Sequence, residues 1–406
     1  MPQQLALHGG PKAVHTIFPW PIFDETEVQA VAEVVRSGQW GNPDCTGLVE
    51  KFEREFADYC GAKYAVSCVN GSVSLRLALI ACGIELGDEV IVPPYTFMAT
   101  ASTVVEANAV PIFVDIDPET YNLDPTKIEA AITPRTKAIV AVHFAGQSCD
   151  MEAIMAIAKR HNLRVVEDAA HAHGAEYKGE KLGTIGDVGS FSFQSSKNLT
   201  SGEGGMAITN DPELYRKMAS LRNVGRLPEG AWYDHFLPGC NYRITPMQAV
   251  LLSSQLKRLD AQTRTRNNNG LLLNELLSGI EGITPLRRGH GETLHCHHLY
   301  IIKYEGRHFG GLSKESFVEI LAAEGVPCFR GYPYPLYKQP LFQDKNFMCY
   351  ALPESASYAG VVCPVAERAC GEEAVWILQH AMLGSEEDMA AFAAAIRKIQ
   401  DSSRLT

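Results

Sequence analysis

Paired cysteine motifs are absent, although the 406 residues include 11 cysteines. No Cys-x-x-Cys pair occurs, so a structural zinc site of the usual spacing is not expected. The odd count, and a chain long enough to bury a large core without cross-links, argue against a disulfide scaffold. We therefore expect reduced thiols, acting as small apolar side chains, in a cytoplasmic protein.

Long apolar runs and basic segments are absent as well. No stretch of about 18 apolar residues suggests a membrane span, and the start shows no secretory signal pattern. Lys and Arg number 36 against 47 Asp and Glu, which gives a formal net charge of −11. Binding to nucleic-acid phosphates needs a basic face. We expect neither a nucleic-acid nor a membrane partner.

Three common site motifs are missing too. The sequence has no G-x-G-x-x-G, no G-x-x-x-x-G-K-[ST] and no H-E-x-x-H, which argues against a dinucleotide fold, a P-loop and a zincin. His171-Ala172-His173 could present two imidazoles on one side of an extended chain. Only Glu167 and Asp168 lie near them in sequence, so we predict no metal site.

What is present is an alternation of short apolar runs with helical stretches. This pattern predicts an α/β protein with a mostly parallel sheet of about seven strands, wrapped by helices. The strands are expected at Tyr64–Val69, Glu89–Val92, Val110–Val114, Ala138–His143, Leu163–Val166, Ser190–Phe193 and Met206–Thr209.

Outside this alternating region the pattern changes, and we therefore divide the chain into three parts. They are an N-terminal arm (1–23), a large domain (24–260) that contains the sheet, and a smaller C-terminal α+β domain (261–406). Asp24 and Glu27 form a capping-box pattern at the start of a helix. In the C-terminal part, a strand is expected at 298–304, with helices at 313–324, 372–382 and 386–399.

Two loops that follow predicted strands hold reactive residue types, and ligands bind at this end of open α/β sheets. Asp168 ends a buried strand, where it needs a cationic partner, either an arginine or a protonated pyridine nitrogen. Lys197 lies in an uncharged stretch of small residues, where a partly desolvated amine becomes a nucleophile. It could equally be an ordinary surface lysine.

Two further segments complete a possible cofactor site. Asn70-Gly71-Ser72 leads from a strand into a helix, as a phosphate site or as an ordinary turn capped by Ser72. Phe97 follows another strand and is either a ring face or a core residue. Together with Lys197 and Asp168 they fit pyridoxal 5′-phosphate (PLP), which needs an amine, a carboxylate at its ring nitrogen and a phosphate cradle.

The sequence resembles the DegT/StrS-type sugar aminotransferases, which are fold-type I PLP enzymes. Nearly the whole chain shares this resemblance, and Lys stands where dehydratases of the family carry His. The motifs that carry it are Ser37-Gly38-Gln39-Trp40-Gly41, Phe52-Glu53-Arg54-Glu55-Phe56, Asn70-Gly71-Ser72, Val92-Pro93-Pro94-Tyr95-Thr96-Phe97, Glu167-Asp168-Ala169-Ala170-His171, Phe191-Ser192-Phe193 with Lys197, Gly202-Glu203-Gly204-Gly205 and Gly239-Cys240-Asn241-Tyr242-Arg243.

The resemblance implies a role for each matching residue. Lys197 would form the internal aldimine, Asp168 would pair with the pyridine nitrogen, and His171 would lie near the phenolic oxygen. Phe97 would stack on the ring. The phosphate would be held by Gly71, Ser72 and Ser192, and by Asn241 of a neighbouring subunit, which implies a homodimer with shared active sites.

Within the family, Leu7-x-Gly9-Gly10-Pro11 and Trp20-Pro21 are most similar to the branch of scyllo-inosose aminotransferases and amino-hydroxybenzoate synthases. This similarity implies transfer of an amino group from glutamine or glutamate to a keto-cyclitol or keto-sugar, by a ping-pong mechanism, in aminocyclitol, amino-sugar or other secondary-metabolite biosynthesis such as that of antibiotics. Contacts to the acceptor are expected from Arg222, Arg330, Tyr332 and Tyr337.

Two alternatives stay open. One is a PLP-dependent dehydratase or aromatase that acts on an amino-shikimate-type substrate. The other is a PLP-binding regulatory protein without turnover.

Overall fold

A seven-stranded sheet forms the centre of the computed structural model, which describes residues 4–41, 43–353 and 356–403. The strand order is β1-β9-β8-β5-β4-β2-β3. Neighbours from β8 to β3 are parallel, whereas β9 is antiparallel to both β1 and β8. The predicted sheet is confirmed, with β1 (Tyr64–Cys68), β2 (Glu89–Val92), β3 (Val110–Phe113), β4 (Thr136–Val142), β5 (Arg164–Asp168), β8 (Val188–Ser192) and β9 (Gly205–Thr209).

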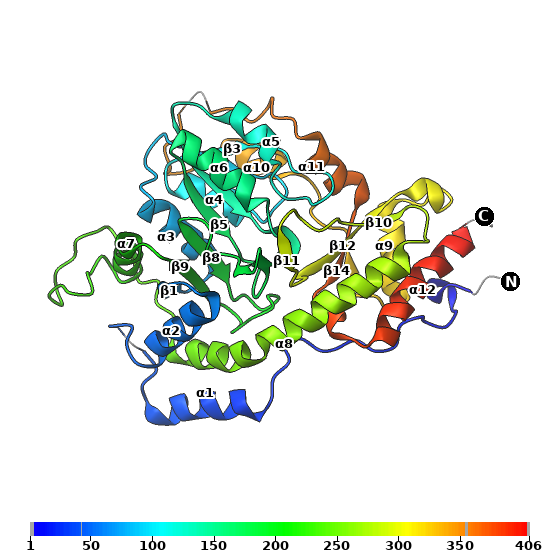
Figure 1. The fold of residues 1–406 in the computed structure, drawn as a ribbon, viewed down its shortest axis with the longest axis horizontal. Coiled ribbons are helices and arrows are strands. Elements are labelled where there is room, and N and C mark those ends of the chain that lie inside the picture. Colours follow the sequence, from blue (N-terminus) through cyan, green and yellow to red (C-terminus); the bar gives the residue numbers. More distant parts are fainter. Residues whose placement is uncertain (1–3, 42, 354–355, 404–406) are drawn as a thin grey trace.

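Helices cover both faces of this sheet (Figure 1). Consecutive strand residues point to opposite faces, so Val166 packs in one apolar core and Val165 in the other. The first core lies under α3 (Gly71–Ala81), α4 (Ala99–Glu106) and α7 (Pro212–Arg222). The second lies under α2 (Leu48–Cys60), α5 (Pro125–Ile128), α6 (Met151–His161) and the first half of α8 (Pro246–Leu277).

The C-terminal part contains a four-stranded antiparallel sheet with the order β10-β12-β14-β13. A third, small sheet has the order β11-β6-β7. The bounds are β6 (Glu176–Tyr177), β7 (Glu180–Lys181), β10 (Ile283–Pro285), β11 (Glu292–Leu294), β12 (Leu299–Tyr304), β13 (Cys328–Phe329), β14 (Ala374–Leu378), α9 (Lys314–Ala323), α10 (Pro340–Gln343), α11 (Pro364–Arg368) and α12 (Glu386–Ser403).

Short helical turns link these elements. They are η1 (Ala6–His8), η2 (Glu129–Ala131), η3 (Phe144–Gly146), η4 (Gly306–His308), η5 (Leu336–Lys338), the π-turn η6 (Ala369–Glu373) and η7 (Ala381–Leu383).

The helix predicted at residues 372–382 is wrong, because β14 (Ala374–Leu378) occupies the middle of this segment. Val375, Trp376 and Ile377 are β-branched or aromatic, which favours a strand. β14 is paired on both sides, with β12 and β13. The helices predicted at 313–324 and 386–399 are confirmed as α9 and α12.

α8 is a single helix of 32 residues that begins at a capping box formed by Thr245 and Gln248. It passes from α1 (Glu25–Ser37) and α2, beside the seven-stranded sheet, to α12, beside the four-stranded sheet (Figure 1). The predicted domain boundary at residue 260 lies inside this helix. The division of the chain into an arm and two domains therefore stays a prediction.

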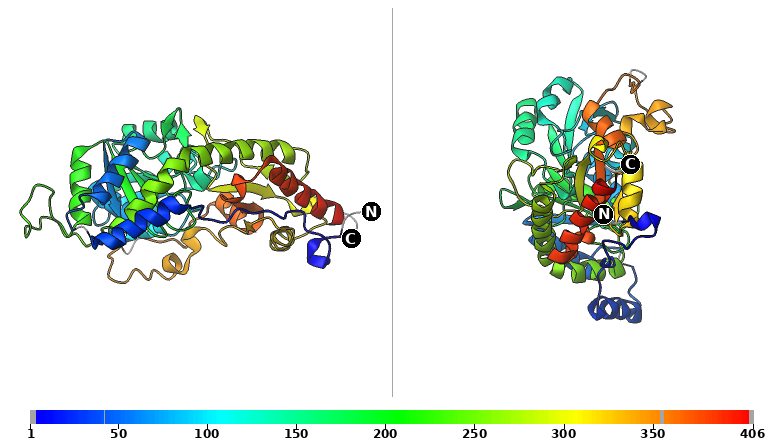
Figure 2. Two further views of the ribbon diagram at one scale, coloured as in Figure 1. Left: turned by 90° about the horizontal axis from the view of Figure 1, so that it is seen from below. Right: turned by 90° about the vertical axis from the view of Figure 1, so that its right-hand side faces the viewer.

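The segment before α1 (Glu25–Ser37) packs on the C-terminal part of the molecule. The backbone amides of Ala6 and Ala13 donate to the Glu324 carboxylate at 2.8 and 3.1 Å, and Lys398 also pairs with Glu324 at 2.8 Å. α1 then projects below the body (Figures 1 and 2). It begins at the Asp24–Glu27 capping box that the sequence predicts.

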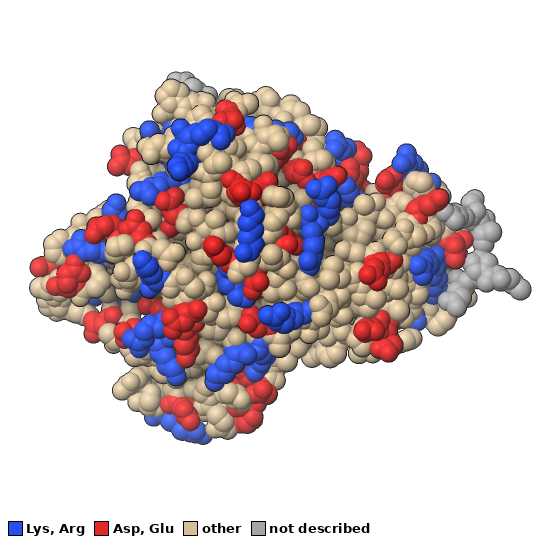
Figure 3. Space-filling model, viewed as in Figure 1, with Lys and Arg blue, Asp and Glu red and all other residues tan. Residues whose placement is uncertain are grey.

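Charges of both signs alternate over the face shown in Figure 3, where no area is basic alone. None of the helices in the described part of the chain has the length and apolar character to cross a membrane.

Candidate active site

A cavity of about 860 Å³ opens where β5 and β8 end and α3 begins. The four-stranded sheet and the loops after its strands close the other side, with Trp376 from β14, Tyr332 after β13 and Gln379 after β14. The cavity thus brings together segments that lie as far apart as residues 20 and 380 in the sequence. The sequence-predicted residues that line it are Gly71, Ser72, Phe97, Asp168, His171, Ser192, Lys197 and Tyr332.

Lys197 and Asp168, the predicted cation and anion of the site, both line this cavity. Burial lowers the pKa of the Lys197 amine to about 8, against the opposing effect of the Asp168 carboxylate. About a tenth of such an amine is neutral at pH 7, far more than of an ordinary lysine with a pKa near 10.5, and the neutral form is the nucleophile and proton acceptor. Desolvation of this kind is the effect expected from the uncharged stretch around Lys197.

The Asp168 carboxylate is held in a defined orientation at the end of β5. Its Oδ2 accepts a hydrogen bond from Thr100 Oγ1 at 2.8 Å, and its Oδ1 accepts one from the Ala170 amide at 3.3 Å. Burial raises the pKa of Asp168, whereas the Thr100 hydrogen bond and the Lys197 charge oppose that rise. A cationic ring nitrogen beside this carboxylate would favour its ionised form further.

Gly71 and Ser192 form a tight contact at the N-terminus of α3. A Cβ atom on residue 71 would lie 2.6 Å from the Cβ of Ser192, so only glycine fits there. Asn70 caps the helix, since its side chain accepts from the Val73 amide at 2.9 Å. The amides of the first turn of an α-helix have no intrahelical partner and favour an anion. The arrangement can hold a phosphate between Gly71, Ser72 and Ser192.

His171 is neutral and has a defined tautomer. Its Nδ1 accepts a hydrogen bond from the Ala145 amide at 3.3 Å, so the proton of the neutral ring lies on Nε2. Burial, then the charge of Lys197, holds the pKa of His171 well below its usual range. The ring can therefore donate one hydrogen bond to an oxygen in the cavity.

Aromatic side chains supply the apolar surface of the cavity. Phe97 lines it and is 62% exposed, so its ring is available to a flat ligand. Tyr332 packs edge-on against Trp376 and Tyr95, with ring centroids 4.7 and 5.4 Å apart. Tyr332 is thus the one predicted acceptor residue that the structure places in the cavity.

The other predicted residues lie elsewhere. Arg222 is buried and donates to the Glu53 carboxylate and to the Ser67 carbonyl, the latter at 3.2 Å. Tyr337 is also buried, with its hydroxyl donating to the carboxylate of Glu367. Both side chains are paired with carboxylates of their own chain, and neither lines the cavity.

Arg330 and Asn241 are exposed and do not line the cavity of their own chain. Arg330 lies between two residues that do line it, Phe329 and Gly331. Asn241 forms an isolated backbone bridge with Asn223.

Sequence reasoning missed other cavity residues, among them Thr100, His298 and Gln379. His298 ends the unusual run His295-Cys296-His297-His298 in front of a strand, and that run was an available signal. Gln379 directly follows β14. It was missed because that segment was assigned to a helix, whereas polar residues at strand ends are the ones that reach such a site.

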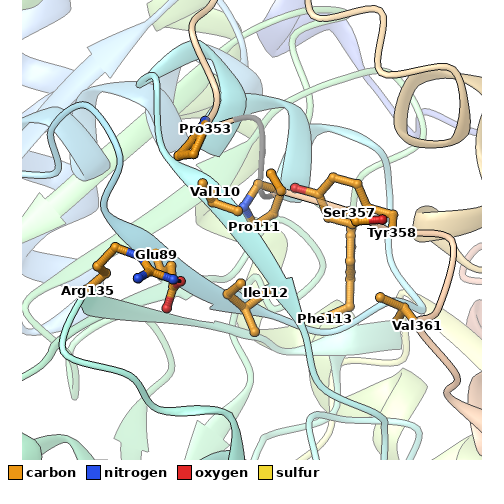
Figure 4. Close-up of a pocket in the computed structure, with 11 residues that line it drawn as sticks. Glu89, Val110, Pro111, Ile112, Phe113, Arg135, Pro353, Ser357, Tyr358 and Val361 are labelled. Atoms are coloured by element: carbon orange, nitrogen blue, oxygen red, sulfur yellow. Dashed lines mark hydrogen bonds and ion pairs between the residues drawn. The ribbon is translucent and has the colours of Figure 1, made fainter.

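A second cavity of about 180 Å³ lies at the β3 edge of the large sheet (Figure 4). Its lining includes Pro111, Phe113 and Tyr358, with the Glu89–Arg135 ion pair at one side. None of the predicted site residues lines it. Within the described ranges, no group of three His, Cys, Asp or Glu side chains could hold a metal ion.

The donor set of the large cavity fits PLP. An amine of lowered pKa, a buried carboxylate, an exposed aromatic ring and a glycine-lined helix N-terminus are the groups that this cofactor requires. The fit depends on Gly71 in particular, because a larger residue would fill the space beside Ser192.

Known proteins resemble this chain over nearly its whole length. An L-glutamine:2-deoxy-scyllo-inosose aminotransferase from Streptoalloteichus tenebrarius is 40% identical, with 98% of each chain covered. The crystal structure of 3-amino-5-hydroxybenzoic acid synthase matches with a TM-score of 0.87 and 32% identity, over 97% of this chain and 100% of that one. NtdA from Bacillus subtilis, solved with the cofactor PMP bound, matches with a TM-score of 0.79 and 27% identity, over 93% and 82%.

The profile of the DegT/DnrJ/EryC1/StrS aminotransferase family matches residues 21–396. This matched range covers all three sheets and every residue that lines the cavity except Trp20. The chain belongs to the DegT/DnrJ/EryC1/StrS aminotransferase family, whose members depend on PLP.

Proposed function

We propose that this enzyme transfers the amino group of L-glutamine to a keto-cyclitol of the 2-deoxy-scyllo-inosose class, with PLP held on Lys197. The observation that carries the proposal is the Lys197 amine of lowered pKa beside Asp168 in the large cavity. The named substrates of the 40% identical relative support glutamine as donor and a keto-cyclitol as acceptor.

The proposed cofactor contacts follow from the cavity. The α3 N-terminus, with Gly71, Ser72 and Ser192, would hold the phosphate, and Phe97 would cover one ring face. Asp168 would accept a hydrogen bond from the protonated ring nitrogen, and His171 Nε2 would donate to the phenolic oxygen. When bound, PLP supplies an electron sink that stabilises negative charge at the carbon next to the amino group.

The chain's own chemistry is then proton transfer and positioning. Lys197 Nζ would take the proton from the donor's α-carbon and return it later in the cycle, first as base and then as acid. A pKa of about 8 suits both directions. The acceptor half-reaction reverses these steps, which predicts ping-pong kinetics.

A homodimer with shared active sites is part of this proposal. Asn241 lies outside the cavity of its own chain, and Trp40, Trp232 and Phe236 are exposed apolar side chains. Such side chains fit a protein interface. We further propose that the enzyme is cytoplasmic, because all 11 cysteines are free thiols, which fits a reducing compartment.

The two alternative functions predict different products. A dehydratase or aromatase of the amino-shikimate type would share the cofactor but not the aminated product. It draws support from the 3-amino-5-hydroxybenzoic acid synthase match. A regulatory protein would bind PLP without turnover.

The deciding experiment supplies purified enzyme with L-glutamine and a panel of keto-cyclitols and nucleotide-linked keto-sugars. Mass spectrometry should detect an aminated cyclitol. Borohydride reduction followed by peptide mapping should place the cofactor on Lys197, and Lys197→Ala should abolish turnover, with the exposed Lys159→Ala as control. Reaction with nucleotide-linked sugars alone, or amino transfer retained in Lys197→Ala, would contradict the proposal.

A further inference from the structure

Arg266 is a fully buried cation without an anionic partner. It lies near the middle of α8, and its exposed fraction is 0%. Among the residues that the structure describes, no carboxylate oxygen comes within 4.0 Å of its guanidinium. Burial lowers the pKa of Arg266 to about 9, so the group is still charged near neutral pH. An isolated buried charge is costly unless a counter-charge reaches it.

Its partner is a neutral amide, the side chain of Gln379. Arg266 Nη2 and Nε donate to Gln379 Oε1 at 2.5 and 3.1 Å, and Nε also donates to the Gln379 carbonyl at 3.3 Å. A guanidinium can only donate, so the amide oxygen must face it. Two buried donors then have no acceptor: Arg266 Nη1 and Gln379 Nε2.

Of this pair, Gln379 lies at the wall of the large cavity, and Arg266 lies behind it as its hydrogen-bond partner. Gln379, only 2% exposed, lines that cavity together with Lys197 and Trp20. The Arg266 guanidinium carbon lies 5.4 Å from the Trp20 ring centroid. Burial, together with positive charges that include Lys197 and Arg266, holds the pKa of His298 well below its usual range. Arg266 therefore contacts the cavity wall through its hydrogen bonds to Gln379.

We propose that Arg266 and Gln379 recognise the carboxylate of the amino donor. The inference rests on the proposed function, because that function defines which ligands enter the cavity. The cofactor phosphate belongs at the α3 N-terminus, on the large-sheet side. A keto-cyclitol carries no negative charge. The donor's carboxylate is thus the anion that two unpartnered, charge-assisted donors would accept.

Gln379 makes this recognition selective. Because Arg266 fixes its amide oxygen, the Nε2 group can only donate, so the pair cannot act as an acceptor for a hydroxyl proton. A carboxylate beside Gln379 would give its free Nε2 donor an acceptor and would supply the counter-charge that Arg266 lacks. A neutral ligand of the same shape leaves the guanidinium without a counter-charge.

Calorimetric titration of the holoenzyme tests the proposal without turnover. The probe is glutaric acid monoamide, which is glutamine without its amino group, and glutaramide is the matched ligand without the carboxylate. Wild-type enzyme should bind the monoamide about 10- to 100-fold more tightly, the range expected for charged hydrogen bonds. Arg266→Gln and Gln379→Glu should each reduce this preference to about threefold or less.

Gln379→Glu keeps the test decisive if Arg266→Gln fails to fold, because it supplies the missing anion internally and should retain or raise Tm. Arg258→Gln is the control, since it removes a guanidinium of the same helix that already pairs with Glu27 at 2.6 Å. This variant should keep the preference. Retention of the wild-type preference in Gln379→Glu would overturn the proposal.

The half-reactions separate this proposal from the proposed function. In Gln379→Glu, the reaction with glutamine should slow at least tenfold more than the reaction with the keto acceptor. If wild-type enzyme fails to use glutamine but keeps its preference for the monoamide, the proposed function fails and the carboxylate site stands. If wild-type enzyme uses glutamine and Gln379→Glu keeps both the preference and the donor rate, the carboxylate site fails alone.

Discussion

The rings of His171 and His298 pack against each other with centroids 4.1 Å apart and planes 34° apart. His298 Nδ1 is hydrogen-bonded at 3.1 Å to the side chain of Asn198, the residue after Lys197. The Asn198 amide also donates to the Cys296 carbonyl at 2.9 Å. The segment before β12 thus supports both the proposed phenol-side histidine and the chain position of the proposed nucleophile.

His298→Ala should lower kcat about tenfold, equivalent to roughly 1.4 kcal/mol of activation free energy. The variant frees the His171 ring to leave its orientation. Asn198 loses one hydrogen bond but keeps the one to the Cys296 carbonyl, which should hold the chain at Lys197. Steady-state kinetics with glutamine provide the measurement, and His8→Ala is a surface control. An unchanged kcat would show that the Ala145 hydrogen bond alone fixes His171.

Thr100→Val should raise the pKa of Asp168, because the hydrogen bond from Thr100 favours the carboxylate. The loss of one hydrogen bond to a charged group is about 1.5–3 kcal/mol. We expect cofactor affinity, followed by absorbance titration, to fall at least tenfold. Thr100→Ser retains the hydroxyl and should stay close to wild type. Equal affinities of the Val and Ser variants would contradict the prediction.

The Lys197 amine should react as a group with a pKa of about 8. Below that pH it is mainly protonated and inert, so the rate of PLP binding to cofactor-free enzyme should rise as pH increases through 8. In Asp168→Asn the midpoint should move to lower pH, because the carboxylate charge that favours the ammonium is removed. A midpoint near 10.5, the ordinary value, would mean that burial does not tune this amine.

Gly71→Ala should weaken cofactor binding at least tenfold, because the added methyl meets Ser192 at 2.6 Å. It should also lower the free energy of unfolding by about 1–3 kcal/mol, as overpacked sites do. Gly279→Ala is the matched control, since a Cβ there meets nothing within 4 Å. Cofactor titration and chemical denaturation give the two readouts. Two variants of equal behaviour would rule out the steric argument.

Arg222→Ala should destabilise the protein by about 3–5 kcal/mol, because it leaves the Glu53 carboxylate buried without its cation. The KM for the keto acceptor should change less than twofold. Urea denaturation and acceptor titration distinguish the two effects. A raised KM at unchanged stability would instead support the substrate contact that the sequence suggested.

Much of the large sheet was predictable because its strands are short apolar runs separated by turns. The expected strand at Glu89–Val92 has the observed bounds, and the other six overlap their predicted ranges. Lys197 and Asp168 were also accessible to prediction, because each follows such a run. Local sequence therefore identifies these elements and the residues at their ends.

The four-stranded sheet and the residues that it contributes to the cavity were harder to predict. β14 is five residues long, and its pairing with β12 and β13 joins segments far apart in sequence. Arg222 illustrates the same limit, since its partner Glu53 is 169 residues away. Periodicity contains no information on such partners, and so Gln379, Arg266 and the burial of Arg222 emerged only from the fold.

The edge strand β3 has a consequence for solubility. Its amides at Val110 and Val114 donate to the Asp88 and Val92 carbonyls, so the intervening Pro111 faces away from β2, toward the chain segment that includes Pro353 and Tyr358 (Figure 4). Proline has no N–H to offer there, and the edge strand of a sheet otherwise attracts strands of other chains. Pro111 thus interrupts the donor row of this edge, and the segment that includes Pro353 and Tyr358 lies over it. Together they leave β3 little free backbone with which a second copy could pair edge to edge.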